Sequence, residues 1–386
     1  MMPSRVQEFF MSFGPAWIVM IADVDAPSIL TAATAGAAYG YGLAWFFLVL
    51  TIPLFVIQEV SGRIGIATGK GLGEVIRSSY SRRTAVAASA PMALVDIVSY
   101  IAEYTGIAIG GELVGIPPLV SMPLAYVAQI LIVRRKNYFS IEKVLIAIST
   151  VLVLAYAGSL VFRGFTHSSF AYFSSDPSYL LLLAASAGAV VMPFMLFYQA
   201  SATAKKGGVR LWAMRTETLV GAVASEVGMI VIMMASAGLG NATDFASPTI
   251  LPGALSIVAD SYAQYLFAVG LVAAAFLALM VISMASSWAI VEAVGWGKNS
   301  FFWVYLAESI PGVAIPIFYP DLLSLVLGLM VAFVFVLAGP GILMGKIASD
   351  VRVMGEYASR GFLKFAYWTS LAAVLSFGLV ALYAVL

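Results

Sequence analysis

Long apolar runs recur along the whole 386-residue chain, and few folds can accommodate them. Each run is near or above the ~20 residues that a helix needs to cross the hydrocarbon core of a bilayer. Apolar residues make up 62% of the chain and charged residues 10%, whereas a soluble domain has about 45–50% and about 25%. The sequence therefore predicts an all-α membrane protein that forms one membrane domain over residues 1–386, with the lipid bilayer as its surroundings.

The apolar runs are separated by charged or Pro/Gly-rich breaks, which predict eleven transmembrane helices. They lie at residues 12–35, 42–65, 87–112, 117–134, 141–163, 179–204, 213–238, 260–294, 301–318, 322–346 and 363–385.

Basic residues are distributed unevenly over this predicted topology. Of the 20 Lys and Arg residues, 19 fall on one side and only Arg163 falls on the other. Because cytoplasmic loops carry an excess of Lys and Arg, this bias predicts a cytoplasmic N-terminus and an external C-terminus. We expect the plasma membrane as the location.

Several function classes are disfavoured by composition. A net charge of +1 with no large basic block argues against nucleic acid as a partner. The absence of cysteine excludes thiolate metal sites and cysteine nucleophiles. An intramembrane hydrolase would be expected to carry Gly-x-Gly-Asp or His-Glu-x-x-His, and neither pattern occurs. We therefore expect a protein that is not an enzyme and has no resident cofactor.

Two predicted helices are interrupted at corresponding positions. The first is broken at residues 25–28 (Asp-Ala-Pro-Ser), and the sixth, five spans later, at residues 189–193 (Ala-Val-Val-Met-Pro). Many secondary transporters contain inverted repeats whose broken helices meet at the bilayer midplane. The pattern predicts a LeuT-type 5+5 inverted repeat, residues 12–163 and 179–346, with an extra terminal helix at 363–385. The alternative is that the two prolines merely kink two helices.

The first break carries an acidic residue, Asp25, which we expect to bind a cation. A charged residue at the bilayer centre costs at least about 2.5–3.5 kcal/mol, and the carbonyls freed by a helix break suit cations. Asp23 points about 200° away on the same helix, so only one of the two is expected to face the site. Ser28 adds a hydroxyl and Met192 a thioether, which favours Mn²⁺, Fe²⁺ or later transition metals over Mg²⁺. The alternative for Met192 is simple packing.

Other acids lie within the predicted spans. Asp96 and Glu103 are seven residues apart, which places them on one face of a helix, and that face could relay protons. The alternative is that each acid is a satisfied polar group between helices. The remaining intramembrane acids are Glu226, Glu292 and Glu308.

The sequence around these features resembles the Nramp family of divalent metal transporters. The stretches that carry the likeness occur in family order along nearly the whole chain. They are residues 14–31, 36–40, 58–59, 63–72, 102–103 with Gly106, and Met192-Pro193.

The resemblance implies roles for individual residues. Family members carry Asp-Pro-Gly-Asn in helix 1 and Met-Pro-His in helix 6, with the Asp, Asn and Met as metal ligands. Asp25 and Met192 match, whereas Ser28 stands where the Asn would be. Phe194 and Gln199 stand where two histidines would be, so Gln199, like Glu226, is a further candidate polar site.

The proton path of the family is matched less well. Glu103 aligns with an acid associated with that path, but Tyr100 replaces a second acid, and Glu308 lies where arginines are expected. These departures indicate a divergent member.

The expected function is import of divalent transition-metal cations by alternating access, with coupling to protons. Asp25, Met192 and Ser28 would bind the metal, and the carbonyls of Ala22 and Ala189 would complete its shell. One alternative is an Nramp-related transporter of Mg²⁺ or other hard divalent cations without strong proton coupling. Two others are a carrier of a small organic substrate and a metal sensor that has lost transport.

Overall fold

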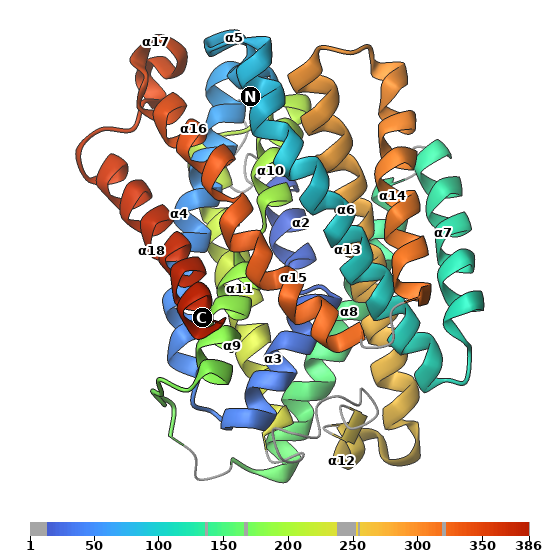
Figure 1. Ribbon diagram of the computed structural model, residues 1–386. Helices are drawn as coiled ribbons and strands as arrows, with labels where there is room; N and C mark the ends of the chain where they lie inside the picture. The colour runs from blue at the N-terminus through green and yellow to red at the C-terminus, as the bar shows by residue number, and fades with distance from the viewer. Residues whose placement is uncertain are drawn as a thin grey trace, which may run out of the picture.

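The computed structural model describes residues 14–135, 138–165, 169–237, 252–253, 255–318 and 322–385. This part of the chain is a bundle of helices, and no strand occurs in it (Figure 1). The all-α prediction is therefore confirmed.

The described part of the chain contains seventeen α-helices. In chain order they are α2 (Pro15–Ala22), α3 (Ala26–Tyr39), α4 (Ala44–Thr68), α5 (Leu72–Ser79), α6 (Arg82–Leu113), α7 (Pro118–Arg135), α8 (Tyr138–Arg163), α9 (Pro177–Val190), α10 (Pro193–Lys206), α11 (Leu211–Ser236), α12 (Ser256–Ala259), α13 (Ala263–Val294), α14 (Phe301–Phe318), α15 (Leu322–Val336), α16 (Ala338–Ser349), α17 (Val351–Met354) and α18 (Gly361–Val385).

Eight helical segments are long and apolar enough to cross a membrane, and the bent pair α2 and α3 makes a ninth in the described residues. Two shorter apolar helices, Pro118–Arg134 and Thr150–Phe162, fall within two further predicted spans. Every predicted span thus coincides with a helix or a broken pair of helices. The number eleven itself remains a prediction.

The first break follows from the chemistry of its residues. Asp25 caps α3 from an extended backbone conformation, and Pro27 occupies the first turn of α3. Proline has no N–H to donate, so it suits the start of a helix rather than its interior. The two halves meet at 48°. The second break repeats this design, since Met192 caps α10 and Pro193 is the first residue of that helix.

A third interruption lies between α15 and α16, where the sequence predicts one span over 322–346. The helix restarts at Ala338, and Pro340 lies in the first turn of α16. Without an N–H, Pro340 cannot bond to the carbonyl four residues earlier, so the helical ladder is interrupted here.

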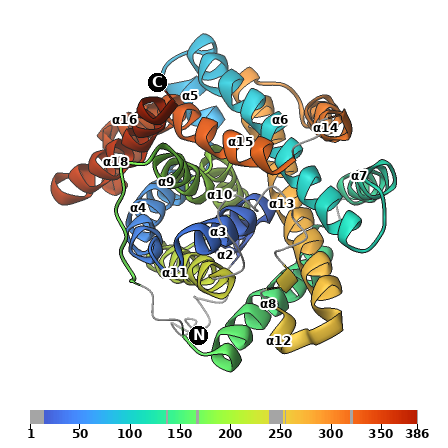
Figure 2. The ribbon, with the colours of Figure 1, turned by 60° about the horizontal axis from the view of Figure 1, so that its bottom comes forward.

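Corresponding helices in the two halves of the chain make corresponding contacts. The half-helix α2 packs on α10 while α3 packs on α9, and α3 packs on α11 as α10 packs on α4. Figure 2 shows α3, α4, α9, α10 and α11 grouped together with α6 and α13 beside them. This pairing is what a 5+5 inverted repeat requires.

Glycines permit two of these equivalent contacts. A Cβ at Gly36 of α3 would lie 1.8 Å from the carbonyl oxygen of Met233 on α11. In the other half, a Cβ at Gly65 of α4 would lie 2.4 Å from the carbonyl oxygen of Ala200 on α10. Small residues let membrane helices approach closely, because packing replaces the hydrophobic effect between helices in lipid.

Candidate metal-binding site

Asp25 places a buried carboxylate at the first helix break. Its Oδ1 accepts a hydrogen bond from the backbone N–H of Ser28 over 2.8 Å, which caps α3. Its Oδ2 has no hydrogen-bond donor among the described residues, although the side chain is fully buried. A buried carboxylate oxygen without a donor is costly, so this oxygen is suited to a cation or a proton.

Ser28 connects the two breaks. Its hydroxyl donates to the carbonyl oxygen of Ala189 over 3.3 Å, across 161 residues of sequence. Two of the predicted ligands therefore lie in contact. The hydroxyl oxygen of Ser28 still has lone pairs available, and the Ala189 carbonyl has a second lone pair.

Met192 holds the position in the second break that Asp25 holds in the first. It is buried, caps α10 from an extended conformation, and its carbonyl accepts from the N–H of Met195 over 3.2 Å. Ala22 ends α2, where the last carbonyls of a helix lack intrahelical donors. Because α2 packs on α10 and α3 on α9, the five predicted ligands come from two breaks that face each other.

Glu103 joins this site from α6. Its carboxyl group interacts with the carboxyl group of Asp25 and with the N–H of Ala26. One turn further on, a Cβ at Gly106 would lie 2.3 Å from the Cβ of Ala26, so the glycine lets α6 approach the break. The structure thus brings together the predicted metal ligand and the predicted proton residue.

Asp96 lies elsewhere on α6, next to Glu308 of α14. All four carboxyl oxygens of this pair are buried and lack hydrogen-bond donors among the described residues. Tyr100 also adjoins Glu308, and its ring lies 6.3 Å from that of Tyr305 on α14. Sequence reasoning named Glu308 as an intramembrane acid and as a departure from the family pattern, but missed its pairing with Asp96.

Asp23 has hydrogen-bond partners different from those of Asp25. Its Oδ2 accepts from the Ser225 hydroxyl over 2.7 Å, and its charge interacts with Glu226 on α11. Both carboxyl oxygens of Glu226 lack donors in the described part of the chain. The candidate Glu226 therefore adjoins Asp23. The sequence showed only that both acids lie within predicted apolar spans, which did not predict that they pair.

Gln199 lies on α10, seven residues after Met192, which is about 10 Å along a helix. Its Nε2 donates to the hydroxyl of Thr218 on α11 over 3.0 Å, and its Oε1 has no donor among the described residues. Gln199 therefore lies where α10 meets α11, away from the break itself.

Charged contacts tie the broken helices to their neighbours at the end of the bundle where α5 and α17 lie (Figure 1). Glu217 of α11 accepts from the N–H groups of Gly14 and Trp17 over 2.7 Å each, at the start of α2. Lys205 of α10 pairs with Glu292 of α13 over 2.7 Å, and Lys205 also lies over the ring of Trp288, 4.2 Å from its centroid. None of these pairings was predicted from the sequence.

The same end contains a buried arginine in an ion-pair network. Arg63 of α4 lies 3.0 Å from Glu59, which also pairs with Arg215 of α11 over 2.7 Å. Arg63 further donates to the Tyr357 carbonyl over 2.7 Å and to the Ser359 hydroxyl over 2.9 Å. The network fixes the segment before α18 onto the bundle.

No group of three or more His, Cys, Asp or Glu side chains that could hold a metal ion occurs among the described residues. A metal ion held between the breaks would therefore take carbonyl, hydroxyl and thioether donors together with the carboxylate of Asp25. Such a mixed set is suited to divalent ions of intermediate softness.

A family model for natural resistance-associated macrophage protein-like (Nramp) proteins matches residues 16–384. The chain belongs to the Nramp family. This confirms the resemblance inferred from the sequence and identifies an integral membrane protein rather than an enzyme.

Curated relatives agree with this assignment. A divalent metal cation transporter MntH of Bacillus subtilis is 33% identical over 203 residues, which are 50% of this chain and 47% of that protein. MntH of Pectobacterium carotovorum is 32% identical over 202 residues, or 50% and 49% of the two chains. The chain thus spans about half the length of the curated relatives it matches.

Solved structures show the shared fold. A manganese transporter of Eremococcus coleocola has a TM-score of 0.78 at 17% identity, covering 98% of this chain and 86% of that one. MhsT in complex with L-phenylalanine has a TM-score of 0.57 at 15% identity, covering 97% of this chain and 99% of that one. These similarities confirm the LeuT-type fold of an Nramp protein.

Proposed function

We propose that this Nramp protein is a secondary transporter that imports divalent transition-metal cations, of the Mn²⁺ or Fe²⁺ type, by alternating access. The observation that carries the proposal is the placement of Asp25 and Met192 as caps of two broken helices that pack on each other. The names of the curated relatives as divalent metal cation transporters support it.

Each donor has a distinct role in this proposal. Asp25 supplies the negative charge through Oδ2, which has no hydrogen-bond donor among the described residues. Met192 supplies a soft sulfur, which favours Mn²⁺ and Fe²⁺ over Mg²⁺ because Mg²⁺ prefers oxygen ligands. The Ser28 hydroxyl and the carbonyls of Ala22 and Ala189 complete the shell. The metal ion is the substrate, and no resident cofactor is needed.

Proton coupling would run through α6. The Glu103 carboxyl contacts the Asp25 carboxyl. A metal ion bound to Asp25 would therefore favour release of a proton from Glu103, because the metal ion and the proton are both positively charged. Asp96, paired with Glu308, would carry the proton onward along the same helix. Glu226 and Gln199 would act as further polar positions beside the path of the ion.

Alternating access would involve the two inverted repeats, 12–163 and 179–346, with the helix at 363–385 outside them. The contacts of Glu217 and of Glu292 close the basic end of the bundle beside α2 and α10. We place this end in the cytoplasm of a cell whose plasma membrane holds the protein, since the basic residues favour that orientation.

A second candidate function is transport of Mg²⁺ or another hard divalent cation without strong proton coupling. The observation that favours it is the oxygen-rich surroundings of Asp25, namely the hydroxyl of Ser28 and the carbonyl of Ala189. Hard cations prefer such ligands.

Uptake by the purified protein in proteoliposomes distinguishes the two. Mn²⁺, Mg²⁺ and Ca²⁺ would be compared at two external pH values in the wild type, Asp25→Ala and Met192→Leu, the last of which keeps the volume but removes the sulfur. The proposal predicts Mn²⁺ uptake that resists excess Mg²⁺ in the wild type and loses this resistance in Met192→Leu. Equal inhibition by Mg²⁺ in both proteins would favour the hard-cation function.

A further inference from the structure

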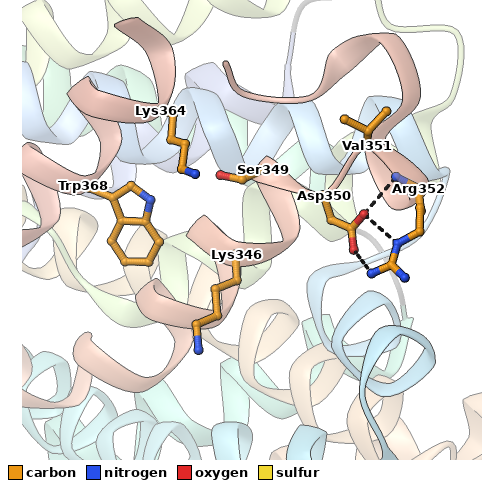
Figure 3. A pocket seen from close by; sticks show the side chains of 7 residues that line it. All are labelled: Lys346, Ser349, Asp350, Val351, Arg352, Lys364 and Trp368. Atoms are coloured by element: carbon orange, nitrogen blue, oxygen red, sulfur yellow. Dashed lines mark hydrogen bonds and ion pairs between the residues drawn. The ribbon is translucent and has the colours of Figure 1, made fainter. Parts of the chain in front are cut away.

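An open pocket of about 510 Å³ lies at the basic end of the bundle, between the end of α16 and the start of α18. It is lined by Lys346, Ser349, Asp350, Val351, Arg352, Lys364 and Trp368 (Figure 3). The proposed transport site makes no use of it, since the pocket is built by residues 346–368 and the two breaks by residues 22–28 and 189–193.

The charges in the pocket are unbalanced. Asp350 is the one acid that lines it, and Asp350 accepts from Arg352 over 2.8 Å. Hydrogen bonds from Arg352 hold the pKa of the Asp350 carboxyl below its usual range, so this acid stays ionised and paired. Figure 3 shows the Asp350 carboxylate facing Arg352 and the side chain of Lys364 extending toward Ser349.

Two ammonium groups are therefore left without an acidic partner. Among the described residues, neither Lys346 nor Lys364 forms an ion pair, and both side chains are exposed. Lys346 lies in the last turn of α16 and Lys364 in the first turn of α18, so both are held on helix ends rather than on a loop. The Ser349 hydroxyl on the same rim donates to the Gly345 carbonyl over 2.9 Å, so the two lysines are the groups that this rim offers to an anion.

The surroundings indicate where this pocket lies relative to the bilayer. α18 is one of the helices long and apolar enough to span a membrane. Its first turns expose Phe362 at 79% and Phe365 at 68%, and Trp368 follows one turn later in the pocket. Trp is enriched at the membrane–water interface, and the exposed Phe side chains beside it offer an apolar surface. The pocket thus lies at the interface, with apolar side chains beside its basic groups.

We propose that this pocket binds the phosphate of an anionic phospholipid from the leaflet on the basic side of the membrane, with an acyl chain against Phe362 and Phe365. Basic pockets between transmembrane helices on this side bind anionic headgroups by the same chemistry. A soluble phosphate ester offers the same anion but has no acyl chain for the two exposed phenylalanines. The site is independent of which ion the protein carries.

The test is lipid retention by the full-length protein, purified in a neutral detergent and titrated with phosphatidylglycerol or phosphatidylcholine, with bound lipid counted by native mass spectrometry. The double variant Lys346→Gln/Lys364→Gln is compared with Arg82→Gln/Arg83→Gln, a matched loss of two exposed charges at the same end but outside the pocket. We expect phosphatidylglycerol to bind more tightly than phosphatidylcholine. Each pocket lysine contributes about fivefold, so the first double variant weakens binding about 30-fold and the control leaves it unchanged.

Three results would overturn the proposal. They are equal binding of the two lipids by the wild type, unchanged binding by the lysine double variant, and displacement of phosphatidylglycerol by millimolar inorganic phosphate, which would indicate a soluble anion. If the double variant does not fold, the preference of the wild type for phosphatidylglycerol and binding about fivefold weaker in Lys364→Gln alone decide the question.

Discussion

The hydroxyl of Ser28 donates a hydrogen bond to the carbonyl oxygen of Ala189 over 3.3 Å, and this contact joins the two broken helices of the fold. Ser28 also offers its N–H to the Asp25 carboxylate. One short residue thus links the acid of the first break to the backbone of the second.

Replacing Ser28 tests this link. Ser28→Ala removes the hydroxyl but leaves the backbone N–H that donates to the Asp25 carboxylate, so α3 should keep its N-terminal cap. A typical hydrogen bond contributes about 1 kcal/mol, so the KM for Mn²⁺ uptake should rise about fivefold. Ser28→Asn restores an oxygen donor at this position and should recover most of the affinity. An unchanged KM in Ser28→Ala would show that the hydroxyl has no part in the site.

Glu103→Gln tests the coupling of metal and proton. Glutamine keeps the shape of the side chain and can still accept from the N–H of Ala26, but it cannot exchange a proton. Wild-type uptake into proteoliposomes should rise when the outside is acidified, whereas uptake by Glu103→Gln should be the same at both pH values. Glu112→Gln, at the exposed end of α6, is the control and should behave as the wild type. Full stimulation in Glu103→Gln would exclude this residue from the proton path.

Gly188 of α9 tests the close helix packing of the second half. A Cβ here would lie 1.8 Å from the carbonyl oxygen of Met330 on α15, so Gly188→Ala forces the helices apart. Overpacking of this kind costs about 1–3 kcal/mol, and the thermal unfolding midpoint in detergent should fall. Gly328→Ala on α15 is the control, because no atom lies within 4 Å of its Cβ position. Equal midpoints for the two variants would contradict the packing described above.

Glu292 tests the closure of the basic end. Lys205 is 46% exposed, so its pair with Glu292 is worth about 0.2–1 kcal/mol, and Glu292→Gln should favour opening by up to about fivefold. The natural chain has no cysteine, so Thr203→Cys, buried where α10 packs on α4, can report opening through labelling by a water-soluble thiol reagent. Labelling should be faster with Glu292→Gln added and unchanged with Glu74→Gln, which breaks the exposed pair with Lys70. A rate unaffected by Glu292→Gln would mean that this pair does not hold the end closed.

The sequence was sufficient to predict the membrane fold and both facing breaks. A run of about 20 apolar residues has few structures available in lipid. An acid two residues before a proline, as at Asp25, or a residue directly before one, as at Met192, marks a helix start within a span. The break at Leu337 was missed, because the predicted span remained uniformly apolar across Pro340. The pairing of Asp96 with Glu308 was missed because it depends on which helices become neighbours.

Equilibrium binding of Mn²⁺ to the purified protein tests whether Asp25 binds the metal. Isothermal titration would compare the wild type with Asp25→Asn, which keeps the capping oxygen for Ser28 but removes the charge, and with Asp176→Asn, the exposed cap of α9. The wild type and Asp176→Asn should each bind one Mn²⁺, and Asp25→Asn should show no measurable binding. Wild-type affinity in a folded Asp25→Asn protein would contradict metal binding by Asp25.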